Sequence, residues 1–151
     1  MDIVKDDLQG HQIKALLQEH LDDMYATSPA ESVHALDIEA LRQSNIEFWT
    51  AWNEQELLGC IALKALDSKH AEIKSMRTAH NARGKGVAKR LLNHLVSQAS
   101  ERGFSRLSLE TGTEDYFTAA RTLYSGHGFV ECDPFADYVL DSNSVFMTRQ
   151  L

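Results

Sequence analysis

The sequence predicts an α/β fold in which helices pack on a mixed, mostly antiparallel sheet. Residues 46–53 alternate in polarity and are rich in aromatic side chains, and residues 57–67 return as a second strand after a turn at 54–56. Residues 70–78 form a third strand, which a helix connects to a strand at 106–111. This last unit is a single β-α-β crossover, so one strand pair is expected to be parallel.

The first part of the chain supplies one short strand and two helices. Residues 2–4 are a strand, and from Leu8 to Ala26 apolar side chains recur at helical spacing. Pro29 ends this helix, because the residue before a proline avoids helical geometry. Residues 36–43 are a short second helix with Asp37 as its N-cap.

The second part of the chain completes the sheet. A helical stripe begins at Val87 and ends at Gly103, a residue type that favours helix termination. A helix at 116–128 and closing strands at 129–133 and 144–150 follow. The predicted sheet therefore has six to seven strands with about four helices, and 151 residues suit one domain, 1–151.

Charge and composition exclude some classes of protein. The net charge of -7 argues against general binding to nucleic acid or to an anionic membrane. No apolar run approaches a membrane span and no leader-like segment begins the chain, so a cytoplasmic location is expected. Cys60 and Cys132 lack metal-ligand spacing, and Cys60 is expected to be a buried thiol.

A basic, glycine-rich bend stands where the strand at 70–78 gives way to the helix from Val87. Free N–H groups at a helix N-terminus bind phosphates, and Gly84 and Gly86 allow the backbone a close approach. A solvated basic loop is the alternative. The Walker pattern is absent, and a dinucleotide G-x-G-x-x-G pattern would need glycine where Lys89 stands.

The segment RGKGVA, Arg83 to Ala88, resembles the Q/R-x-x-G-x-G/A signature of the GNAT N-acetyltransferase superfamily. The preceding strand, the following helix and the segment Ala119–Phe129 also stand at the family's positions. The segments SPAESVHAL, EIKSMRT, LSLETG and NSVFM also resemble a bacterial subgroup of small stand-alone members. The resemblance implies a sheet splayed between its fourth and fifth strands.

The resemblance further implies acetyl-CoA as cosubstrate, with no metal. The pyrophosphate would lie on backbone amides of the signature loop, and the pantetheine arm beside the strand before it. The cofactor-binding residues implied are Met76, Arg77, Thr78, Arg83, Gly84, Lys85, Gly86, Val87, Ala88 and Lys89. One position departs from many relatives: Phe117 stands where they carry a cofactor-contacting Asn, and Thr118 is the available substitute.

The chemistry of amine acetylation sets the catalytic expectations. An attacking amine must lose a proton, the thioester oxygen needs a donor such as a backbone N–H near Met76, and the departing thiolate needs a proton. By position in the family, Tyr124 supplies the last proton. Glu72 is the expected base, on a strand face shared with Lys74, Met76 and Thr78, and Glu110 is its rival.

The acceptor is expected to be a small primary amine that attacks acetyl-CoA directly in a ternary complex. The segment after the first helix forms an acceptor wall in this family, which makes Glu31, Ser32 and His34 substrate-binding candidates, together with Glu110. A protein lysine or N-terminus as acceptor, or a non-catalytic acyl-CoA-binding module, are the alternatives. A homodimer is also expected to be available, with residues 133–147 at its interface or over the acceptor cleft.

Overall fold

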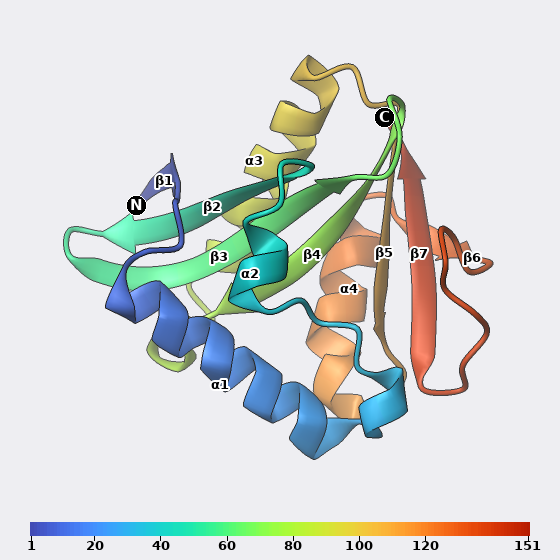
Figure 1. Cartoon of the computed structure of the whole chain (residues 1–151), viewed down its shortest axis with the longest axis horizontal. Coiled ribbons are helices and arrows are strands. Elements are labelled where there is room, and N and C mark those ends of the chain that lie inside the picture. Colours follow the sequence, from blue (N-terminus) through green and yellow to red (C-terminus); the bar gives the residue numbers. More distant parts are fainter.

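The computed structural model describes residues 1–151 as a seven-stranded sheet with helices on both faces (Figure 1). The strand order is β1-β2-β3-β4-β5-β7-β6, and only the β4–β5 pair is parallel. The predicted fold class, with its mixed sheet and single crossover, is confirmed.

The element bounds follow the sequence pattern closely. The strands are β1 (Asp2–Lys5), β2 (Ile46–Asn53), β3 (Glu56–Ala65), β4 (His70–Thr78), β5 (Arg106–Gly112), β6 (Val130–Cys132) and β7 (Ser144–Gln150). The α-helices are α1 (His11–Thr27), α2 (Ile38–Leu41), α3 (Val87–Glu101) and α4 (Thr118–Gly126). Single 3-10 turns are η1 (Ala30–Ser32), η2 (His80–Ala82) and η3 (Asp115–Phe117).

Two hydrophobic cores lie on the two faces of the sheet. In front of the sheet in Figure 1, α1 and α2 cover a core that includes Ile13, Leu17 and Cys60. Behind it, α3 and α4 cover a larger core that includes Leu91 and Leu95. Both faces are buried, which explains why β3 reads as a nearly continuous apolar run.

The sheet opens between β4 and β5. These strands pair only over three positions, from His70 with Arg106 to Glu72 with Ser108, and then diverge toward their C-terminal ends (Figure 1). The splay that the family resemblance implied is therefore present. It exposes the inner edges of both strands to a cleft.

A β-bulge in β4 overturns one sequence-based expectation. Ser75 has a positive φ of 51°, and the pairing of β4 with β3 shifts register between Cys60 and Ala62. An extra residue in a strand reverses its alternation beyond that point. Lys74, with Glu72 beside it, therefore points to the η1–α2 connection, where it donates to the His34 carbonyl, whereas Met76 contacts Tyr124 of α4. The prediction that these residues share one face was wrong.

The helix predictions differ from the structure mainly at their ends. Leu8 precedes α1 in a left-handed conformation with φ 64°, and its side chain is buried. Asp37 caps α2 as predicted, accepting a hydrogen bond from the Ala40 N–H at 2.9 Å, but α2 itself has only four residues. No helix has the length and apolar character needed to cross a membrane.

Candidate active site

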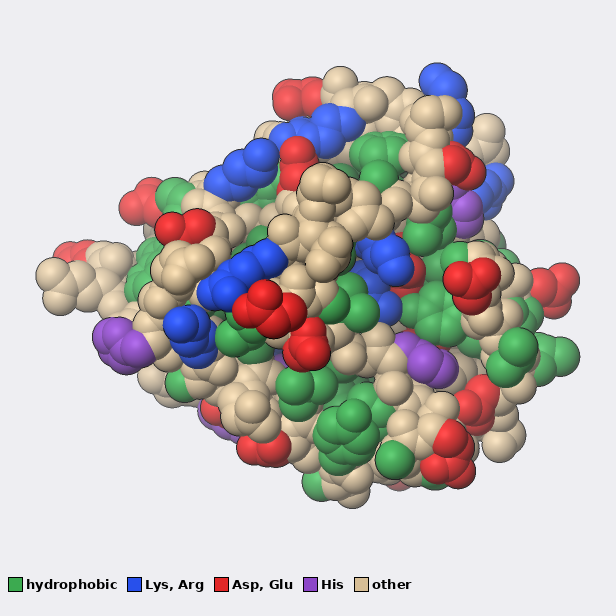
Figure 2. Space-filling model, viewed as in Figure 1, with side chains coloured by type: hydrophobic (Ala, Val, Ile, Leu, Met, Phe, Trp, Pro, Cys, Tyr) green, Lys and Arg blue, Asp and Glu red, His purple; other side chains and the backbone are tan.

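A cleft of about 580 Å³ lies where β4 and β5 separate. Most of the predicted site residues line it, from the signature loop and from both splayed strands. Glu31 and Lys85 do not line the cleft, and both are exposed. Acidic and basic side chains are interspersed over the α1 face, so this face carries no large patch of one sign (Figure 2).

The signature loop, Arg83 to Lys89, presents a row of unused backbone donors. None of the N–H groups from Gly84 to Lys89 donates a hydrogen bond within the protein. Gly84 and Gly86 adopt positive φ angles of 76° and 79°, and a Cβ at either position would point into open space. Only glycine takes this backbone geometry without strain.

The loop fits a diphosphate on physical grounds. The 15-residue helix α3 begins at Val87, so the positive end of its dipole points at the loop. Arg83, Lys89 and Arg90 add exposed positive charge beside the free N–H groups. These features together favour an anion with several oxygens, such as the pyrophosphate of coenzyme A.

Tyr124 on α4 places its hydroxyl at the inner wall of the cleft. The hydroxyl contacts the Met76 sulfur at 3.6 Å, and the ring packs edge-on against Phe129. Burial raises the pKa of the phenol well above its ordinary value. Tyr124 is therefore protonated at neutral pH, which is the form that can donate a proton.

Phe117 occupies the position of the cofactor-contacting Asn of many relatives, and it lines the cleft. Its ring lies so close to Gly112 that a Cβ there would be 2.1 Å from the ring. The Thr118 hydroxyl accepts a hydrogen bond from Arg121 at 3.1 Å and does not line the cleft. An aromatic surface thus replaces an amide here.

Glu72 is buried and belongs to a closed group with Lys74 and Tyr138. The Tyr138 hydroxyl donates to Glu72 at 2.5 Å, and the Lys74 ammonium lies 3.4 Å from the same carboxylate oxygen. Lys74 also donates to Tyr138 at 2.9 Å and to the His34 carbonyl at 3.1 Å. The charge on Glu72 is therefore matched within the protein.

Glu110 on β5 has a different environment. It accepts a hydrogen bond from the Ser144 hydroxyl at 2.7 Å, and one carboxylate oxygen lies 3.3 Å from His34 Nδ1. Burial raises the pKa of Glu110, while Ser144 and His34 oppose that rise. The structure thus brings two of the predicted acceptor-site residues, His34 and Glu110, into contact.

The β6–β7 connection, residues 133–143, forms part of the cleft wall beside Glu72, as the sequence had allowed. Tyr138 and Asn143 line the cleft. Ser32 donates to Asp141 at 2.6 Å and accepts from Asn143 at 3.4 Å, which ties η1 to the connection. Tyr138 also packs edge-on against His34 with ring centroids 5.0 Å apart. No local motif marks Tyr138 or Asn143, because their partners are distant in sequence.

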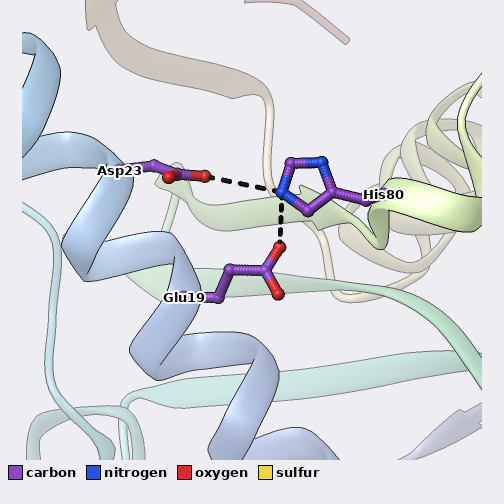
Figure 3. A group of neighbouring side chains, drawn as sticks. All are labelled: Glu19, Asp23 and His80. Atoms are coloured by element: carbon purple, nitrogen blue, oxygen red, sulfur yellow. Dashed lines mark ion pairs between the residues drawn. The ribbon is translucent and has the colours of Figure 1, made fainter.

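A polar group on the other side of the cleft links α1 to β4. Glu19, Asp23 and His80 lie close enough together to resemble a metal-ligand set (Figure 3). The Arg77 guanidinium fills that position, since its Nη2 lies 2.5 Å from Glu19 and 2.6 Å from Asp23. Tyr116 accepts from the other terminal nitrogen at 3.0 Å. These five residues are called the Arg77 cluster below.

The fold and the loop define a GNAT acetyltransferase domain, and comparison with known proteins agrees. Residues 13–129 match the model of the acetyltransferase (GNAT) family, and the chain belongs to that family. The chain is 54% identical to YsnE of Bacillus subtilis, an uncharacterised N-acetyltransferase, and the match covers the full length of both proteins. It is 48% identical to YedL of Escherichia coli, also an uncharacterised N-acetyltransferase, over 99% of this chain and 94% of that one.

Two further comparisons bear on ligands. An IAA acetyltransferase of Azospirillum brasilense is 36% identical over 89% of this chain and 86% of its own length. A GNAT family acetyltransferase of Elizabethkingia anophelis with acetyl-CoA bound shares the fold with a TM-score of 0.72, covering 99% of this chain and 97% of that one at 19% identity. The chain is thus an N-acetyltransferase of a fold that binds acetyl-CoA.

Proposed function

We propose that this protein transfers the acetyl group of acetyl-CoA to the primary amine of a small molecule, by direct attack in a ternary complex. The row of free N–H groups from Gly84 to Lys89 carries the cofactor part of the proposal, because it has no partner within the protein. Acetyl-CoA supplies the acetyl group as a thioester. The backbone of Met76, Arg77 and Thr78 would hold its arm along β4.

Direct attack is supported by the absence of a reactive thiol from the cleft. Neither cysteine lines it. Cys60 is fully buried in the core under α1, and burial raises the pKa of its thiol to about 12. A thiol at that pKa is not a nucleophile at neutral pH. An acetyl-cysteine stage therefore has no candidate residue.

Glu110 is the better-supported proton acceptor. At neutral pH a primary amine acceptor is an ammonium ion, and it must lose a proton before it attacks. Glu72 is already paired with Lys74 and Tyr138, so a second cation gains little from it. Glu110 has a raised pKa. The basic groups near it are His34, in contact with the carboxylate, and Lys74. We assign Glu110 as the base and Glu72 as the residue that positions Tyr138.

Tyr124 is the proposed acid for the departing sulfur. Its hydroxyl is protonated at neutral pH and points to Met76, the residue whose backbone N–H is the proposed donor to the acetyl oxygen. The two groups would thus serve the two atoms of the thioester that gain negative charge. This pairing follows from the bulge at Ser75, which turns Met76 toward α4.

A small acceptor is supported over a protein. The β6–β7 connection covers the acceptor end and contributes Tyr138 and Asn143 to the cleft. The mixed charge of the α1 face offers no extended acidic groove for a basic peptide (Figure 2). The similarity to an IAA acetyltransferase favours one further acceptor, IAA itself, as a test compound.

Free-thiol release from acetyl-CoA tests the proposal. Wild-type protein is incubated with small primary amines, IAA and lysine-containing peptides, and Tyr124→Phe is compared. We expect turnover with at least one small amine, and a loss of tenfold or more in Tyr124→Phe. Faster turnover on peptides than on small amines would show that the acceptor is a protein. Acetyl-CoA binding without turnover on any acceptor would leave a non-catalytic module.

We also propose a homodimer. Val139 and Leu140, on the β6–β7 connection, are 76% and 83% exposed, and β6 is an edge strand with Val130 exposed. Exposed apolar side chains beside an unpaired strand edge support pairing with a second copy. Sedimentation velocity of wild type and Leu140→Ser tests it, and a monomeric wild type would contradict it.

A further inference from the structure

Three polar side chains on the α1 side of the cleft each have a buried atom without a hydrogen-bond partner. They are His20 of α1, through Nδ1, and Ser75 and Arg77 of β4, through Oγ and Nε. All three residues line the cleft. Ser75 is 8% exposed and Arg77 is 4% exposed, so bulk water does not satisfy them. Buried polar groups in native proteins normally have partners.

The three residues lie together because of the bulge in β4. Ser75 is the bulge residue, and Arg77, two positions further along β4, points to α1. Arg77 binds Glu19, the neighbour of His20 in the chain. Burial and the charge of Arg77 lower the pKa of His20 to about 4, so its ring is neutral at pH 7. The group therefore offers donors from Arg77 and Ser75 and a neutral ring nitrogen.

We propose that His20, Ser75 and Arg77 form a specificity subsite that takes an uncharged oxygen of the acceptor, a carbonyl or hydroxyl group, while the amine lies at Glu110. The inference rests on the proposed function and extends it to the class of acceptor. The predicted acceptor is thus a primary amine that carries a neutral hydrogen-bond acceptor at its other end.

Charge selects against the two alternatives. A second ammonium group would meet the guanidinium of Arg77, which is a donor only. A carboxylate would meet Glu19 and Asp23, which together exceed the single charge of Arg77. A neutral oxygen avoids both penalties and still pairs with the Nε–H and the serine hydroxyl. A neutral alkyl end would leave these buried groups unpaired.

The test compares amines that differ only at the far end. Four series carry a terminal amide, carboxylate, ammonium or methyl group on a primary amine, with two, three and four methylenes between the ends. We expect the best amide compound to exceed its methyl analogue by tenfold or more in kcat/KM. The carboxylate and diamine series should also be poorer than the amide series. No preference for the amide, or a preference for either charged end, would overturn the subsite.

Two variants locate the preference in these residues. Ser75→Ala removes the hydroxyl, and His20→Phe keeps the ring but removes its nitrogens. Each is expected to cut the amide-to-methyl ratio at least threefold. Ser100→Ala, at an exposed position on α3, is the control and should leave the ratio unchanged.

The failure of this inference can be told from the failure of the proposed function. If the ratio in both variants stays within the wild-type error, the three atoms do not read the acceptor, although amines are still acetylated. If no amine of any series is acetylated while acetyl-CoA binds, the proposed function itself is wrong. Either variant that folds gives the answer, and the wild-type ratios need no variant.

Discussion

The two ends of the cleft are built in different ways. The phosphate end uses backbone atoms of the contiguous segment Arg83–Lys89, placed by two glycines and one helix. The acceptor end uses side chains from η1 and the residues after it, from β4, from β5 and from the β6–β7 connection. A site made of backbone tolerates many side chains, whereas a site made of side chains changes with each substitution. We therefore expect the first end to be common to the family and the second to select the proposed acceptor.

The largest expected effect is at the acceptor end, in Glu110→Gln. Loss of a general base costs about 100-fold or more in rate. The base acts when deprotonated, so wild-type kcat/KM should rise with pH through a pKa above 4.5, the ordinary glutamate value. The variant should lack this acid limb. A pH profile of kcat/KM with one amine at saturating acetyl-CoA measures both effects.

Glu72→Gln and Glu101→Gln sharpen that measurement. Glu101 is exposed on α3, and its variant should match wild type. Glu72→Gln should lower the rate less than Glu110→Gln does, and it should keep the acid limb. If Glu72→Gln is the more damaging variant and removes the limb, the base is Glu72 and the assignment to Glu110 is wrong.

The next effect is at the phosphate end, in Gly86→Ala compared with Gly103→Ala. Both glycines have positive φ, 79° and 84°, and open space at the Cβ position, so both variants carry similar backbone strain. We expect a weakening of acetyl-CoA binding by about tenfold in Gly86→Ala only, the cost of about one hydrogen bond to a charged group. Calorimetric Kd values decide it. Equal Kd values in the two variants would show that the loop does not bind the cofactor.

The smallest effect lies between the two ends, in the Arg77 cluster. The hydrogen bond from Arg77 lowers the pKa of Asp23, so this group stabilises the fold above its unfolded pKa of about 3.9. The contribution is lost as pH falls through the lower folded pKa. Because Asp23 is 32% exposed, we expect Asp23→Asn to cost about 0.5 kcal/mol at pH 7.

Urea unfolding at several pH values measures this difference. The cost of Asp23→Asn should shrink as pH falls through the lowered folded pKa of Asp23, and it should vanish below that pKa, where the wild-type carboxylate is protonated in both states. Asp22→Asn, on the exposed side of the same helix, should cost nothing at any of these pH values. Acetyl-CoA Kd should be unchanged in both variants. A cost that persists in acid would show that packing, and not charge, holds α1 to β4.

The sequence predicted what is encoded locally. The strands at 46–53, 70–78 and 144–150 match the structure residue for residue, because their polarity patterns lie within one element. The glycine-rich loop was also recognisable, since its donors and its helix are contiguous. The roles of Tyr138 and of the Arg77 side chain were not, because their partners are more than fifty residues away in the chain.

The strand faces were mispredicted for a related reason. Strict alternation along residues 70–78 assumes one residue per ladder position, and the bulge at Ser75 breaks that assumption. The residue type at the bulge does not predict it, because Ser75 is a serine, and not a glycine, in a left-handed conformation. The error placed Glu72 on the same face as Met76. The geometry expected between the predicted base, Glu72, and the predicted acid, Tyr124, was therefore also wrong.

The bulge at Ser75 also has an evolutionary implication. Before the bulge the even-numbered residues Glu72 and Lys74 lie on one face, and after it the even-numbered Met76 lies on the other. A deletion that straightened the strand would move the residues of one half to the opposite face of the sheet and break up the proposed site. Insertions and deletions in β4 should therefore be rarer than substitutions at the same positions.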